Sequence, residues 1–143
     1  MTRPGFAFST RFRVRYAEID GQRIVFNSRY LEYADVAVTE FWRWSGMDAL
    51  GPVWTEAEFN VVQATVQYKA PFRYDDMIEA WVRIDRIGNS SMTTRVELVH
   101  ADTGALHTVI EIVSAHVDLA AGRATPIPDE VRAALMALDT RVA

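Results

Sequence analysis

A carboxylate, Asp20, lies in a predicted loop seven residues before Asn27, which can begin a long helix. A carboxylate can act as a nucleophile or as a general base in hydrolysis. The first turn of a helix offers unpaired backbone N–H groups and a partial positive charge, which together stabilise an anion. Two interpretations of Asp20 follow. It is half of a catalytic site completed by the helix, or it is a loop residue that makes a turn or caps the helix.

Glu18 is a rival carboxylate, because it lies two residues before Asp20. From Phe6 to Tyr16, aromatic residues, Thr and Val alternate with Ala, Ser and three arginines, which predicts a strand with one dry and one basic face. If that strand continued through Glu18, then Tyr16, Glu18 and Asp20 would share a face.

A long helix is predicted to begin at Asn27 or Ser28 and to end at Gly46. Asn and Ser cap helix starts, and glycine tolerates the left-handed conformation that follows a last turn. At the helical period, the polar residues of this stretch fall in an arc of about 140° and the apolar residues occupy the rest. Such a helix needs to be wrapped by a sheet or covered by a partner.

Four more strands are predicted, at Phe59–Ala70, Met77–Ile87, Ser91–Ala101 and Ala105–Asp118. Their short connections, rich in turn residues, indicate antiparallel neighbours. Pro128 and the apolar spacing from Val131 to Leu138 predict a short C-terminal helix. An α+β fold, in which a five-stranded antiparallel sheet curves around one long central helix, satisfies this order.

The length, net charge and composition of the chain narrow the class of protein. The 143 residues suggest a single domain spanning 1–143, and the net charge of −4 gives no global attraction for nucleic acid or an anionic membrane. The absence of cysteine excludes disulfides and thiolate metal sites. His100, His107 and His116 lie far apart along strands, so no metal site is predicted. We see neither a signal peptide nor a transmembrane stretch, which predicts a cytoplasmic protein.

Three stretches carry a resemblance to a known family. RFRVRYAEIDGQRIVFNSRYLEYADVAVTEFW, from Arg11 to Trp42, resembles the start of the 4-hydroxybenzoyl-CoA thioesterase family of acyl-CoA thioesterases. That signature is an aspartate after the first strand, an apolar pair about four residues later and a tyrosine in the helix, which Asp20, Ile24–Phe26 and Tyr30 match. YKAPFRYDDMIEAWVRI (Tyr68–Ile84) and PIPDEVRAAL (Pro126–Leu135) are similar to later parts of the family.

The resemblance implies a hotdog fold and hydrolysis of an acyl-CoA thioester to a carboxylic acid and free CoA, with no cofactor. It gives Asp20 the role of nucleophile or general base, and it assigns the backbone N–H groups near Asn27 to the oxyanion hole. No serine or histidine lies in a recognisable nucleophile motif, which leaves Asp20 as the best reactive group.

This chain departs from the family pattern at two places. Many members have a glycine where this chain has Arg23. If that position has positive φ, arginine there costs on the order of 1 kcal/mol, unless Gly21 takes over the bend. Many relatives also carry a histidine near the helix start, where this chain reads IVFN.

The resemblance also implies residues that bind substrate, namely Phe26, Tyr30, Gln63, Thr65, Arg86, Asn89, Ser90 and Ser91. Gln63 and Thr65 would position water or the acyl group, with a plain strand role as the alternative. Residues 86–91 would meet the pantetheine and nucleotide parts of CoA, with Arg86 pairing a phosphate. The alternative for Arg86 is an exposed hairpin charge.

Relatives place the active site between subunits, so a homodimer or homotetramer is expected. Three rival interpretations stay open. One is a non-catalytic protein that binds acyl thioesters, and another is a hotdog hydratase, against which the lack of histidine in residues 20–45 counts. The third is a different cone-shaped fold of the nuclear-transport-factor-2 type, which usually has more helix before its first long strand.

Overall fold

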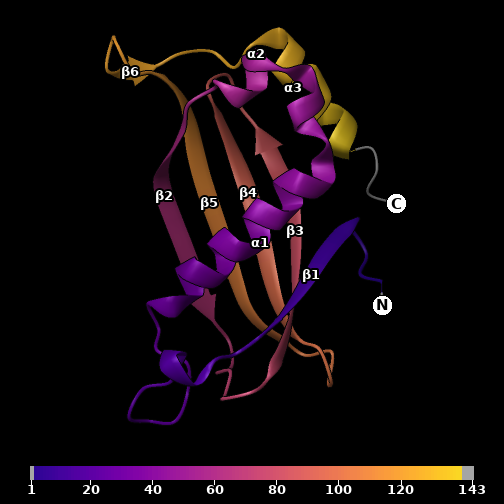
Figure 1. Cartoon of the computed structure of the whole chain (residues 1–143), viewed down its shortest axis with the longest axis vertical. Coiled ribbons are helices and arrows are strands. Elements are labelled where there is room, and N and C mark those ends of the chain that lie inside the picture. The colour runs from indigo at the N-terminus through magenta and orange to yellow at the C-terminus, as the bar shows by residue number, and fades with distance from the viewer. Residues whose placement is uncertain (1, 140–143) are drawn as a thin grey trace.

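A computed structural model describes residues 2–139, and it shows an antiparallel sheet curled around a long helix (Figure 1). The five main strands are β1 (Phe8–Arg13), β2 (Phe59–Tyr68), β3 (Met77–Ile87), β4 (Ser91–His100) and β5 (Leu106–Asp118). They lie in the order β1-β3-β4-β5-β2, and a short sixth strand, β6 (Arg123–Ala124), pairs with β5. The predicted hotdog architecture is confirmed, with β6 as an addition.

The long helix, α1 (Arg29–Ser45), lies across the concave face of the sheet. Ser28 precedes it without a side-chain cap, and Gly46 ends it in the left-handed conformation at φ 73°. A 3-10 turn, η2 (Met47–Leu50), and a short helix, α2 (Pro52–Thr55), lead to β2. The C-terminal helix, α3 (Asp129–Asp139), closes one end of the sheet.

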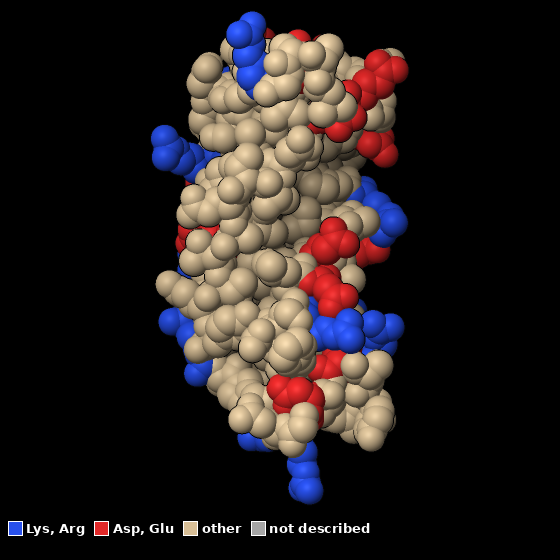
Figure 2. Space-filling view, turned by 90° about the vertical axis from the view of Figure 1, so that its left-hand side faces the viewer, with Lys and Arg blue, Asp and Glu red and all other residues tan. Residues whose placement is uncertain are grey.

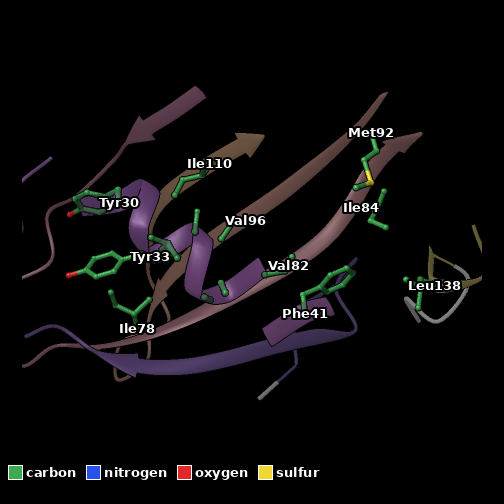
Figure 3. Packing of buried hydrophobic residues seen from close by; sticks show 14 of the residues in the cluster. Tyr30, Tyr33, Phe41, Ile78, Val82, Ile84, Met92, Val96, Ile110 and Leu138 are labelled. Atoms are coloured by element: carbon green, nitrogen blue, oxygen red, sulfur yellow. The ribbon is translucent and has the colours of Figure 1, made fainter. Parts of the chain in front are cut away.

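The core lies between α1 and the sheet (Figure 3). Tyr30, Tyr33 and Phe41 of α1 pack with buried residues of the strands, among them Ile78, Val82, Ile84, Met92, Val96 and Ile110. Burying one large apolar side chain contributes about 1.5–3 kcal/mol, so this contact fixes the rotation of α1 about its axis.

The prediction that α1 is buried around most of its circumference is wrong. Leu31, Val36 and Trp44 keep 46%, 47% and 39% of their surface exposed. The sheet covers only one side of the helix, and β2 forms a free edge beside it. Figure 2 views this side, where an uncharged surface runs between charged residues at its margins.

The first strand is shorter than predicted. β1 ends at Arg13, and the chain then turns into a 3-10 helix, η1 (Tyr16–Glu18). The turn forms because the Arg15 N–H donates a hydrogen bond of 2.8 Å to the Glu18 carboxylate, which removes both residues from the strand. Among residues 2–139, no helix is long and apolar enough to cross a membrane.

Candidate active site

The structure brings Asp20 and Asn27 to the wall of one cavity, which we call the Asp20 cavity. Its volume is about 310 Å³, and it lies where the loop before α1 meets the end of β2. The lining residues are Asp20, Gln22, Ile24, Val25, Asn27, Tyr30, Tyr68, Lys69, Ala70 and Pro71. A carboxylate and the first turn of a helix therefore face the same space.

Asp20 opens a tight hairpin that is closed by the bridge between Ile19 and Val25. Its backbone N–H donates to the Ile24 carbonyl at 2.9 Å, and its Oδ1 accepts the Gln22 N–H at 2.7 Å. Oδ2 makes no hydrogen bond within the described part of the chain. The hairpin thus fixes the carboxyl group through one oxygen and leaves the other for a substrate or a water.

Arg23 has φ 67°, the left-handed conformation that glycine adopts without cost. Of the possibilities left open for this position, the structure shows the one in which residue 23 itself has positive φ. Gly21 does not take over the bend, because it is not among the described residues with positive φ. Arg23 itself makes the bend, and its N–H closes the turn by donating to the Asp20 carbonyl at 3.0 Å.

The first turn of α1 is held from outside the helix. The Tyr68 hydroxyl, at the end of β2, donates to the Asn27 carbonyl at 2.8 Å, and the Arg29 N–H donates to the Phe26 carbonyl at 2.9 Å. The N–H groups of Asn27 and Ser28 donate no hydrogen bond to any residue from 2 to 139. These two amides can therefore receive a negatively charged oxygen.

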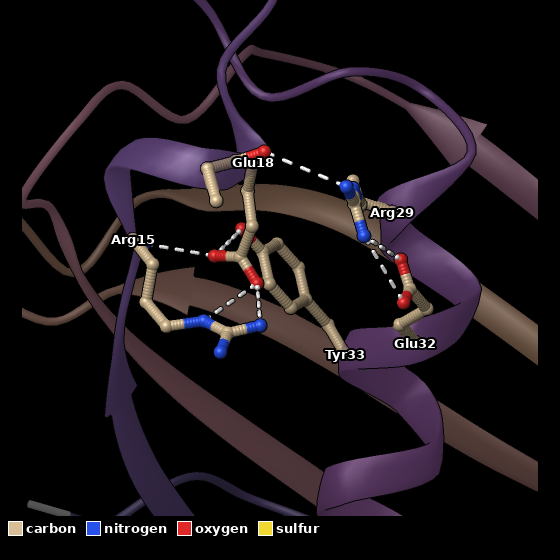
Figure 4. Close-up of polar contacts among 6 residues, drawn as sticks. Arg15, Glu18, Arg29, Glu32 and Tyr33 are labelled. Atoms are coloured by element: carbon tan, nitrogen blue, oxygen red, sulfur yellow. Dashed lines mark hydrogen bonds and ion pairs between the residues drawn. The ribbon is translucent and has the colours of Figure 1, made fainter.

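Glu18, the rival carboxylate, is a buried anchor and does not line the Asp20 cavity (Figure 4). Its Oε1 accepts the Arg15 N–H at 2.8 Å and the Tyr33 hydroxyl at 2.9 Å. Its Oε2 accepts the Arg15 guanidinium at 3.2 and 3.0 Å. The Glu18 carbonyl accepts the Phe26 N–H at 2.9 Å, so this residue ties the Asp20 hairpin to α1 from both sides.

These contacts set the ionisation of the anchor. Burial would raise the pKa of Glu18, but the hydrogen bonds from Arg15 and Tyr33 outweigh burial and hold that pKa below its ordinary value. Burial and the adjacent carboxylate raise the pKa of the Tyr33 hydroxyl far above its ordinary value. Glu18 is therefore an anion held by donors, and Tyr33 stays protonated.

The opposite wall of the cavity is the segment from Lys69 to Pro71. The N–H groups of Lys69 and Ala70 donate to the His107 carbonyl at 2.8 and 3.1 Å. The next residue, Phe72, is fully buried, and its N–H donates to the Tyr30 hydroxyl at 3.2 Å. Tyr30 thus lines the cavity and also supports its opposite wall through its hydroxyl.

Two further predicted site residues, Gln63 and Thr65, do not reach this cavity. They lie on β2 opposite Val113 and Glu111 of β5. A register shift between Val61 and Gln63 turns the strand, so that Ala64 faces α1 while Gln63 and Thr65 point to the outer face of the sheet. Phe26 is beside the cavity but is not part of its lining, and 47% of it is exposed.

Residues 86–91 lie at the other end of the sheet from Asp20. Within one chain, Arg86 and Ser91 flank the β3–β4 turn, which packs beneath α3. The Arg132 guanidinium donates to the carbonyls of Gly88 and Asn89, each at 2.9 Å, and the His116 N–H donates to the Ser90 carbonyl at 2.6 Å. Arg86, Asn89, Ser90 and Ser91 therefore do not meet Asp20 in the monomer.

The sequence did not single out Tyr68, Lys69 or Gln22, which also line the cavity. In the sequence, Tyr68 is simply the last residue of an alternating strand. Only its contact with Asn27 in the structure identifies its role. Nε2 of His100 lies 3.3 Å from the Asp76 carboxylate, and no cluster of metal-ligating side chains occurs in the described part of the chain.

Comparisons with known proteins identify the family and agree with the fold. The family model for the thioesterase-like superfamily matches residues 14–135. The acyl-CoA thioester hydrolase YbgC of Escherichia coli O157:H7 is 28% identical over 95 residues, which are 66% of this chain and 71% of that protein.

Two solved structures extend the likeness over nearly the whole chain. A protein of Pseudomonas aeruginosa strain PAO1 has a TM-score of 0.76 and 28% identity, with 96% of each chain covered. A thioesterase of Thermus thermophilus, solved with coenzyme A and zinc, has a TM-score of 0.79 at 24% identity, covering 95% of this chain and 96% of that one. This second likeness concerns the fold alone.

Proposed function

The chain belongs to the thioesterase-like superfamily, and from that membership we infer that it is a hydrolase of acyl-CoA thioesters. The products are a carboxylic acid and free CoA. We propose that the reaction takes place in the Asp20 cavity. One observation supports this placement: Asp20 lines the same space as Asn27, just before α1, and Tyr30, in its first turn.

In the proposed reaction, the thioester carbonyl oxygen lies against the N–H groups of Asn27 and Ser28. As the carbonyl carbon becomes tetrahedral, these amides stabilise the developing oxyanion. The positive end of α1 adds to this stabilisation. The C–S bond then breaks, and the CoA thiolate leaves and takes up a proton from solvent.

Asp20 supplies the reactive carboxylate through Oδ2, by one of two routes. As a nucleophile, it attacks the carbonyl carbon to give a mixed anhydride, which water then hydrolyses. As a general base, it takes a proton from a water molecule that attacks the same carbon. Hydroxylamine added during turnover distinguishes the routes when the protein is analysed, because only the mixed anhydride can leave a hydroxamate on Asp20, whereas the free thioester itself also gives an acyl hydroxamate.

The test of the proposal is thiol release from a panel of acyl-CoA esters. We expect Asp20→Asn to lower kcat at least about 100-fold without loss of folded protein. Asp102→Asn is the matched control, because Asp102 is an exposed turn aspartate between β4 and β5. An Asp20→Asn variant as fast as the wild type would remove Asp20 from the mechanism. Tight acyl-CoA binding by the wild type without thiol release would indicate a binding protein instead.

We also propose that two copies pair through the free edge of β2. Val61, Val62 and Tyr68 on this edge are 64%, 63% and 53% exposed, and the neighbouring face of α1 exposes Leu31 and Val36. An unpaired edge with apolar side chains favours addition of another strand. Antiparallel pairing about a two-fold axis would bring residues 86–91 of one copy toward the Asp20 cavity of the other.

Sedimentation velocity at micromolar concentration tests this pairing. We expect a dimer or a tetramer for the wild type and a monomer for Val62→Lys, because a lysine on an edge strand opposes pairing. A wild-type monomer that hydrolyses acyl-CoA would overturn the shared site and leave the hydrolase assignment intact.

A further inference from the structure

A second and larger cavity lies between α1 and β2, and we call it the α1–β2 cavity. Its volume is about 670 Å³, within the range of small-molecule sites. It is lined by Leu31, Asp35, Val38, Trp42, Asp48, Trp54, Thr55, Ala57, Glu58, Phe59, Val61, Ala64, Met92, Thr94, Ile112 and Ser114. The catalytic steps described above use none of these residues.

The two cavities follow one another along the same pair of elements. Tyr30, in the first turn of α1, lines the first cavity, and Leu31, the next residue, lines the second. Tyr68 lines the first and Ala64 the second, on the same face of β2. The uncharged surface in Figure 2 runs along this side of the molecule. The α1–β2 cavity is therefore the next hollow along α1 and β2 from the Asp20 cavity.

Aromatic side chains close the far end of this cavity. The ring centroids of Trp42 and Trp54 are 4.9 Å apart, and those of Trp54 and Phe59 are 5.9 Å apart. Met92 is buried beneath, and Ile112 is half-buried. The aromatic end of the cavity and the buried Met92 are thus apolar, while Thr94 and Ser114 add hydroxyl groups to the lining. The carboxylates of its lining, Asp35, Asp48 and Glu58, belong to exposed residues.

We propose that the α1–β2 cavity binds the acyl chain of the substrate, and that the substrate class is an extended, uncharged acyl group of about a dozen carbons. This proposal rests on the proposed function. From Leu31 to Trp42 the helix rises about 16 Å. An extended alkyl chain advances roughly 1.3 Å per carbon, which gives the length. The exposed carboxylates disfavour a substrate that carries a second carboxylate at its far end.

Rates over a series of chain lengths test the proposal. Each methylene that enters an apolar site gains about three- to fourfold in kcat/KM, so this parameter should rise from acetyl-CoA to dodecanoyl-CoA and level off beyond it. An acyl-CoA of the same length with a terminal carboxylate should be at least about tenfold poorer. A series that is flat within twofold would overturn the proposal while leaving the hydrolase in place.

A pair of variants on one strand locates the chain. Ala64→Trp places a large ring in the cavity, whereas Gln67→Trp places the same ring on the opposite face of β2. We expect Ala64→Trp to lower kcat/KM for dodecanoyl-CoA at least tenfold and to leave acetyl-CoA within twofold. Gln67→Trp should change neither. An equal loss for both substrates in Ala64→Trp would contradict the assignment. Sedimentation checks that both variants keep the wild-type assembly.

Binding without turnover separates this proposal from the proposed function. The probe is S-dodecyl-CoA, a thioether that cannot be hydrolysed, titrated calorimetrically against free CoA. We expect the thioether to bind at least 100-fold more tightly than CoA, and the difference to disappear in Ala64→Trp. Equal affinities would overturn the acyl site. Tight thioether binding by a protein that hydrolyses no acyl-CoA would support the acyl site and overturn the hydrolase.

Discussion

The Tyr68 hydroxyl donates a 2.8 Å hydrogen bond to the Asn27 carbonyl, joining the end of β2 to the first turn of α1. The start of α1 has no side-chain cap, because the Ser28 hydroxyl makes no capping hydrogen bond. The orientation of the free Asn27 and Ser28 amides therefore depends on a contact between two residues that are 41 apart in the sequence.

Removal of this contact should disturb catalysis more than stability. A single hydrogen bond contributes about 0.5–1.5 kcal/mol, so we expect Tyr68→Phe to lower kcat about three- to tenfold. KM should change little, because the phenyl ring remains in the wall of the cavity. Steady-state kinetics of thiol release measure both values. Tyr74→Phe is the control, since Tyr74 is a similarly exposed tyrosine outside the cavity. Equal kcat in wild type and Tyr68→Phe would show that the bond does not orient the amides.

Glu18 should contribute to stability rather than to chemistry. Glu18→Gln removes the charge that accepts hydrogen bonds from Arg15 and Tyr33 in a buried site, so we expect the free energy of unfolding to fall by about 1–3 kcal/mol. Glu32→Gln is the control, because the Arg29–Glu32 ion pair is exposed and contributes at most about 0.5 kcal/mol. Urea denaturation at pH 7 measures both.

The same residue predicts an acid-dependent loss of stability. The folded pKa of Glu18 is lowered from 4.5, so the unfolded chain takes up this proton first as the pH falls. Its stabilisation is complete well above pH 4.5 and is lost as the pH drops through the folded pKa. We expect this part of the acid transition to be absent in Glu18→Gln. An unchanged transition below pH 4.5 would mean that other carboxylates dominate.

Arg23→Gly should stabilise the hairpin that carries Asp20. Arg23 adopts φ 67°, where a side chain costs about 1 kcal/mol relative to glycine, although glycine also gains entropy in the unfolded chain. We expect a net gain of at most about 0.5 kcal/mol, measured as a small rise in Tm. Arg23→Ala keeps a Cβ at this position and should give no gain. A rise of Tm in both variants would assign the effect to the lost charge rather than to the backbone.

The hairpin shows what the sequence can predict. The end of α1 at Gly46 and the antiparallel pairs β3–β4 and β4–β5 follow from local rules about glycine, capping and short connections. The pairs β1–β3 and β2–β5 do not, because β2 does not pair with β3 despite the short connection between them. The approach of Asp20 to the start of α1 also follows, because only seven residues separate Asp20 from Asn27. Proximity in sequence limits the number of places where the carboxylate can lie.

The missed features depend on events that no local pattern records. A register shift between Val61 and Gln63 inserts one residue and reverses the faces of the rest of β2, which moves Gln63 and Thr65 away from α1. The strand predicted through Tyr16 stops early because Glu18 folds back onto the Arg15 N–H. The contact of Tyr68 with Asn27 requires the closed sheet, since β2 reaches α1 only after the chain has turned.

A histidine behind the cavity wall predicts a second pH dependence. The His107 ring lies 4.4 Å from that of Phe72 and 5.5 Å from that of His100, and its buried Nδ1 has no hydrogen-bond partner among the described residues. Burial and the neighbouring His100 lower the pKa of His107 below 6.5, against the opposing effects of Asp76 and the Pro71 carbonyl. His107 is therefore held neutral while its own carbonyl supports Lys69 and Ala70.

The unfolded chain protonates this histidine near pH 6.5, whereas the folded protein resists protonation until a lower pH. The unfolded state thus binds more protons in this window, and the free energy of unfolding falls as the pH drops below about 6.5. Each unit of difference between the two pKa values contributes about 1.4 kcal/mol. We expect urea denaturation at pH 7.5, 6.5 and 5.5 to show this fall in the free energy of unfolding for the wild type. The fall should be shallower for His107→Phe. Parallel slopes for the two proteins would mean that His107 titrates alike in the folded and unfolded states, and that its buried Nδ1 costs the fold nothing on protonation.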